Sequence, residues 1–174
     1  MVFTVVGCAN SPPPIRGSVD ERSQAMSLAW DLLADERKVD GLLVIKSADS
    51  SIAELLKEIA TACGEAADRL EAIAEAQEVP LDDSGLPPAE VRVRAEIAAA
   101  TTRELLFTSG ATFERRILLT QVEALGYGAA LLAEVSGQLE AAGLASEAEA
   151  VGADGNRLAS LRKRVVDLLA VTRP

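Results

Sequence analysis

The chain has no histidine among its 174 residues, so it lacks the usual general base near neutral pH and the commonest side-chain ligand for metal ions. Only two cysteines are present, Cys8 and Cys63, which are too few for a disulfide framework or a cysteine-rich zinc site. The sequence also has no glycine-rich phosphate-binding loop and no nucleophile-elbow motif. These absences predict a protein that is not an enzyme and that holds no metal or other cofactor.

Aromatic residues are also scarce. They make up 3% of the chain, although hydrophobic residues as a whole make up 49%. Strands favour β-branched and aromatic residues, whereas alanine, leucine and glutamate favour helices. The composition therefore predicts an all-α protein. No uninterrupted apolar run approaches the roughly 20 residues of a membrane span.

Basic residues are outnumbered: 17 lysines and arginines stand against 27 acidic residues, which gives a net charge of −10. Phosphate groups repel an acidic protein, so we expect no binding to nucleic acid and no adsorption to anionic membranes. The one basic run, residues 162–164, falls near the end of a predicted helix, where the helix dipole favours cations.

Helical periodicity is what the sequence does contain. Hydrophobic residues recur at three- and four-residue spacing in five segments with short connections. Ser18 with Glu21 and Ser146 with Glu149 have the spacing of capping boxes, and Ser109 is a candidate N-cap. Whether the first helix continues through residues 42–45 stays open. We predict an antiparallel bundle of four or five helices, formed by the single domain 18–172, with helices over residues 18–37, 51–78, 88–107, 110–143 and 146–169.

Two of these helices have seams that bear on function. Cys63 lies near the centre of the apolar stripe of the second helix, where its thiol should be buried, with a raised pKa, and should not act as a nucleophile. The third helix should face the bundle with a seam that consists of Val91, Ala95, Ala98, Thr102 and Leu105.

The N-terminus resembles the lipobox of a bacterial lipoprotein. The aliphatic run Val5-Val6-Gly7 precedes Cys8, and a polar, proline-rich stretch follows it. In this interpretation residues 1–17 are a truncated lipoprotein signal and a tether, and Cys8 carries the lipid. The apolar segment before Cys8 is shorter than a complete signal sequence requires. The alternative is an ordinary cytosolic N-terminus.

Two polar residues lie on the predicted buried face of the fourth helix, Glu114 and Gln121. A buried carboxylate is costly unless it is paired, so we expect Glu114 to form an ion pair with Arg162 of the fifth helix. These three residues and Cys63 are the candidate polar site of the core.

A family resemblance rests on the same region. The pattern Leu106-x-x-Ser109-Gly110-x-x-Phe113-Glu114-Arg115, followed by Gln121-Val122-Glu123, resembles a ferritin-like family of unknown function from bacterial envelopes. The resemblance implies a ferritin-like bundle at the outer membrane or in the periplasm. It also implies a histidine on several helices. Here those positions hold other residues, namely Cys63, Leu125, and Arg162 or Arg164.

Three functions remain open at this point. The first is a non-catalytic bundle, tethered to an envelope membrane through Cys8, that serves as a structural or interaction module. The second is a ferritin-like protein that binds a metal or small ligand through Glu114, Gln121 and Cys63. The third is a cytosolic bundle that self-associates into a homo-oligomer.

Overall fold

The computed structural model describes residues 19–82 and 86–171. Within these residues every regular element is a helix, so the predicted all-α class is confirmed. The first helix, which was predicted over residues 18–37, ends at residue 36 in the structure. A separate 3₁₀-helix follows it. In chain order the elements are α1 (Val19–Glu36), η1 (Val39–Val44), α2 (Ser50–Ala76), α3 (Pro88–Phe107), α4 (Gly110–Ala141) and α5 (Ala145–Val171).

Local sequence explains several helix ends. The Oδ1 atom of Asp49 accepts a hydrogen bond from the Ser51 N–H at 2.9 Å and so caps the start of α2. Ser109 occupies the predicted N-cap position of α4, although its side chain makes no capping bond. Gly143 follows the C-cap of α4 with φ +82°, a conformation that glycine adopts without strain.

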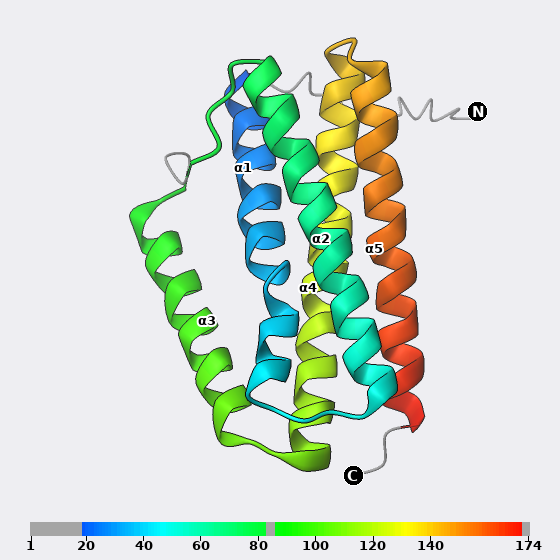
Figure 1. The fold of residues 1–174 in the computed structure, drawn as a ribbon. Coiled ribbons are helices and arrows are strands. Elements are labelled where there is room, and N and C mark those ends of the chain that lie inside the picture. Colours follow the sequence, from blue (N-terminus) through cyan, green and yellow to red (C-terminus); the bar gives the residue numbers. More distant parts are fainter. Residues whose placement is uncertain (1–18, 83–85, 172–174) are drawn as a thin grey trace, which may run out of the picture.

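Helices α1, α2, α4 and α5 form a four-helix bundle, and α3 lies outside it (Figure 1). In the bundle α1 packs against α2 and α4, while α5 packs against the same two helices from the other side. Since α3 returns the chain from one end of the bundle to the other, α2 and α4 run in the same direction (Figure 1).

The bundle encloses one hydrophobic core. The nine residues whose spacing predicts the apolar stripe of α2 are all buried, namely Ile52, Leu55, Leu56, Ile59, Cys63, Ala66, Leu70, Ile73 and Ala74. Most of the apolar residues that recur at helical spacing on α4 and α5 are buried too. The largest fully buried side chains come from three helices, and these are Met26, Leu33, Leu55, Leu56, Ile59, Leu70, Phe113, Ile117, Leu118, Leu125, Leu132 and Leu139. Periodicity therefore located the core correctly on four of the five helices.

The structure corrects the prediction for α3. Of its predicted seam only Leu105 is buried, whereas Ala95, Ala98 and Thr102 are exposed. Instead, α3 contacts α4 through polar groups: the Arg94 guanidinium donates a hydrogen bond to the Tyr127 hydroxyl at 3.2 Å, and Glu104 pairs with Arg116. The helix is therefore a loosely attached arm.

Of the two predicted capping boxes, one is wrong and the other lies partly outside the described residues. Helix α5 begins at Ala145, so Ser146 lies inside the helix and the predicted box with Glu149 is wrong. The backbone N–H of Ala148 bonds the Leu144 carbonyl, which shows that helical pairing has already started there. The other box includes Ser18, which lies outside the described residues.

Among the described helices, α4 alone has the length and apolar composition of a membrane span. One third of its most apolar window is buried inside the bundle.

Candidate functional site

The polar centre of the core is a hydrogen bond between α1 and α4. Gln121 is 2% exposed, and its Nε2 atom donates to the Oε2 atom of Glu36 at 2.8 Å. The other amide atom, Oε1, is buried and has no partner among the described residues. Glu36 is the last residue of α1 and is half-buried. Burial raises the pKa of its carboxyl group, which the bond from Gln121 only partly offsets.

Cys63 lies at the same level of the bundle. Cys63 is 1% exposed, and a Cβ on the adjacent Gly64 would make ordinary van der Waals contact with the Arg37 side chain, 3.7 Å from its Nε atom. Burial, and then the negative charge of Glu36, raise the pKa of Cys63 to about 12. The predicted raised pKa is confirmed, and at neutral pH this residue is a buried thiol and not a nucleophilic thiolate.

Glu114 and Arg162 do not join this cluster, and the ion pair predicted between them is wrong. Glu114 is half-exposed, and its Oε1 atom accepts a hydrogen bond from the Asp49 N–H at 2.8 Å, which ties the start of α4 to the start of α2. Arg162 extends over Gly126 and donates from Nε to the Val122 carbonyl at 3.1 Å. A side chain at residue 126 would displace this guanidinium, since a Cβ there would lie 2.9 Å from Nε.

Cys8 lies outside the described residues. Leu125 is buried in the core, and Arg164 pairs with Glu58 of α2 at 2.6 Å. Within residues 19–82 and 86–171, no three His, Cys, Asp or Glu side chains gather in a way that could hold a metal ion.

Glu36 is the residue that sequence reasoning missed. It follows Leu33 by three positions, so it continues the buried stripe of α1. The three-residue spacing from Leu33 therefore indicated that Glu36 faces the core. Its charged neighbours Asp35 and Arg37, however, are typical of a helix end that is exposed to solvent.

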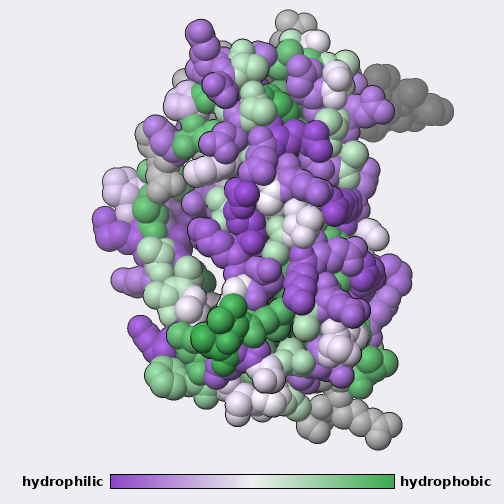
Figure 2. Space-filling view, in the orientation of Figure 1, coloured by the Kyte–Doolittle hydropathy of each residue, from purple (hydrophilic) through white to green (hydrophobic). Residues whose placement is uncertain are grey.

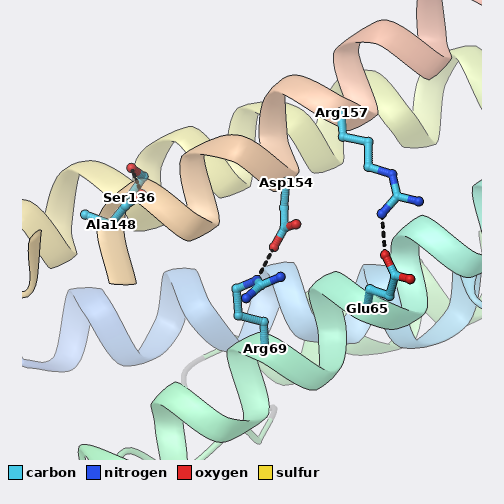
Figure 3. A network of polar contacts seen from close by, with 6 residues as sticks. All are labelled: Glu65, Arg69, Ser136, Ala148, Asp154 and Arg157. Atoms are coloured by element: carbon cyan, nitrogen blue, oxygen red, sulfur yellow. Dashed lines mark hydrogen bonds and ion pairs between the residues drawn. The ribbon is translucent and has the colours of Figure 1, made fainter. Parts of the chain in front are cut away.

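A second polar network joins α2 to α5 (Figure 3). Asp154 is mostly buried and accepts from Nε of Arg69 at 2.7 Å, and Arg157 pairs with Glu65 one turn away. These ion pairs connect α2 with α5 and so help to fix the register of the two helices.

Replacing Glu36 with glutamine should make the protein less sensitive to rising pH. Because the folded-state pKa of Glu36 is raised, its contribution to stability is present below the ordinary value of 4.5 and is lost as pH rises through the raised value. A glutamine keeps the contact with Gln121 and never ionises. Urea midpoints at pH 4 and pH 8 should therefore show a gain for the variant over wild type that appears only at the higher pH. An equal difference at both pH values would contradict the assignment.

Comparison of the chain with known protein families, with curated proteins and with solved structures finds no match. The ferritin-like resemblance consequently stays a prediction.

Proposed function

We propose that the chain is a non-catalytic helical-bundle module, tethered to a bacterial envelope membrane through a lipid on Cys8, that works through its outer surface. The observation that carries the proposal is the contrast between its inside and its outside. The interior is closed by packed hydrophobic side chains, and its buried polar residues Gln121 and Asp154 each bind a residue of a neighbouring helix. Helix α3, in contrast, buries only Leu105 over its whole length.

The connectivity of the bundle supports the family part of the proposal. Ferritin-like bundles have one long crossover connection, which makes two of their helices run parallel. Here α3 and its flanking turns are such a crossover between α2 and α4 (Figure 1). The resemblance around Ser109–Glu123 adds to this, although the histidine positions hold other residues.

The mass of the protein isolated from membranes tests the tether. If Cys8 is processed and lipidated, the mature chain begins at Cys8 and carries a thioether-linked lipid. A Cys8→Ala variant should then move from the membrane fraction to the soluble fraction. An unmodified Cys8 in a chain that still begins at Met1 would refute the tether.

A second candidate is self-association, which the exposed seam of α3 favours. Ala95, Ala98 and Thr102 are small and lie at heptad-like spacing, so another helix could approach closely. Light scattering would then give a mass of at least twice the 18.2 kDa chain, and Ala98→Glu would return it to the monomer value. A monomer mass for the wild-type chain would exclude this candidate.

A ligand-binding role is less well supported, because Glu114 lies apart from Gln121 and Cys63. If a ligand is bound in the core, Glu36 replaces Glu114 in the site. Elemental analysis of purified protein tests whether that ligand is a metal ion, since a metal-binding core requires metal in stoichiometric amount.

A further inference from the structure

Four hydrophobic side chains protrude at one end of the molecule, where η1 meets the turn between α3 and α4. Val44 is 86% exposed, Phe107 84%, Ile45 62% and Leu106 40%. Two hydrogen bonds hold the segments together, because Nζ of Lys46 donates to the carbonyl oxygens of Leu106 and Thr108. We call this surface the apolar tip. Figure 2 shows a strongly hydrophobic patch at the lower end of the molecule, beside the lower end of α3.

The exposure of the tip is built into the packing of η1. Leu42 and Leu43 pack against the core, whereas Val44 and Ile45, the next two residues, extend outward. Turning Val44 and Ile45 inward would expose the two leucines instead. The chain therefore leaves this hydrophobic surface in contact with water, and a partner that covered it would gain free energy by removing it from water.

Free cations lie beside the tip. Arg103 is one turn from Phe107 on α3, and Arg115 lies in the second turn of α4. Neither has a carboxylate or carbonyl partner among the described residues, whereas the neighbouring Arg116 is paired with Glu104. Two guanidinium groups are thus available to an anionic partner.

Charge is divided unevenly between the two ends of the bundle. The half that contains the tip, residues 37–63, 98–121 and 158–171, has ten basic and seven acidic residues. The described part of the opposite half, residues 19–36, 64–82, 86–97 and 122–157, has five basic and 19 acidic residues. The repulsion from anionic surfaces that the net charge predicts is therefore concentrated at the end away from the tip.

We propose that the apolar tip docks on the surface of an anionic lipid bilayer. Protruding side chains such as Val44 and Phe107 can insert among lipid headgroups, while Arg103 and Arg115 bind lipid phosphates. The acidic half is repelled by the same surface, which favours contact through the tip. A protein partner would instead need a groove that matches it, and these side chains stand out from the surface.

Vesicle flotation tests the docking with the unlipidated Cys8→Ala chain. The Cys8→Ala chain with an unchanged tip should bind vesicles that contain phosphatidylglycerol. The binding should be weaker when salt is added, and weaker to vesicles of pure phosphatidylcholine. Val44→Glu with Phe107→Glu should lower the partition coefficient by at least about tenfold, and so should Arg103→Glu with Arg115→Glu. The matched control is Val93→Glu, which changes an exposed hydrophobic residue near the far end of α3 and should leave binding unchanged.

Each other outcome overturns the proposal. These outcomes are no binding by the folded parent chain, binding that survives both double variants, or equal loss with Val93→Glu. Every protein in the comparison has the same N-terminal segment, so that segment cannot explain a difference. The proposed docking depends on the tip and not on a lipid at Cys8. Because the chain in this experiment has no Cys8, a negative result would refute the docking and leave the proposed tether untouched.

Discussion

Phe113→Ala is expected to lower the free energy of unfolding by about 3–5 kcal/mol, the largest effect of any single change considered. Phe113 is fully buried in the first turn of α4, in one core cluster with the buried stripe of α2. Truncation leaves a cavity that backbone movement cannot fill, because Glu114 and Lys46 tie the surrounding segments together. Urea unfolding followed by circular dichroism measures the loss.

Phe113→Leu is the control for this prediction. Leucine keeps much of the buried volume, so the loss should be clearly smaller. If alanine costs no more than leucine, the start of α4 is not packed as described.

Gly155→Leu is expected to destabilise the protein by about 1–3 kcal/mol, because α4 and α5 are in near-backbone contact at this point. A Cβ on Gly155 would lie 3.3 Å from Cβ of Leu132 and 3.5 Å from the Ala129 carbonyl oxygen. Backbone atoms cannot rotate away, so the two helices would have to separate. The same urea experiment reports the change.

Gly137→Leu is the matched control, because a Cβ at residue 137 meets nothing within 4 Å. Leucine there should stabilise α4 by up to about 1 kcal/mol, since glycine is a poor helix former. The two substitutions should therefore have opposite signs. The same sign at both sites would contradict the close approach of α4 and α5.

The apolar stripes of α2 and α4 could be predicted from sequence because each is long and strictly periodic. Ile52, Leu56, Ile59 and Leu70 fall on one face at 100° per residue, and a face of that size must be covered. The seam of α3 had the same spacing, but three of its five residues, Ala95, Ala98 and Thr102, are small. Its burial would contribute little free energy, and α3 is held instead by the buried Leu105 and by polar contacts such as Arg94 with Tyr127.

The sequence predicted two of the three residues at the polar centre of the core. Gln121 and Cys63 are buried as expected, but their charged neighbour is Glu36 and not Glu114. Position on a helical wheel gives the face of a residue but not its depth along the bundle. Glu114 lies near the end of the bundle, where its carboxylate reaches the Asp49 backbone. The pairing of helices that brings α1 beside α4 follows from the crossover, which no local pattern specified.

Hydrogen exchange measured by mass spectrometry tests most directly the central claim, a closed four-helix bundle with α3 as an outlying arm. In dilute, unlipidated Cys8→Ala protein, amides of residues 89–107 should exchange through local opening of α3, far faster than those of α4 and α5. The amides of α4 and α5 should exchange only when the whole bundle unfolds. Exchange of α3 as slow as that of α4 would show that its face is covered and would contradict the account.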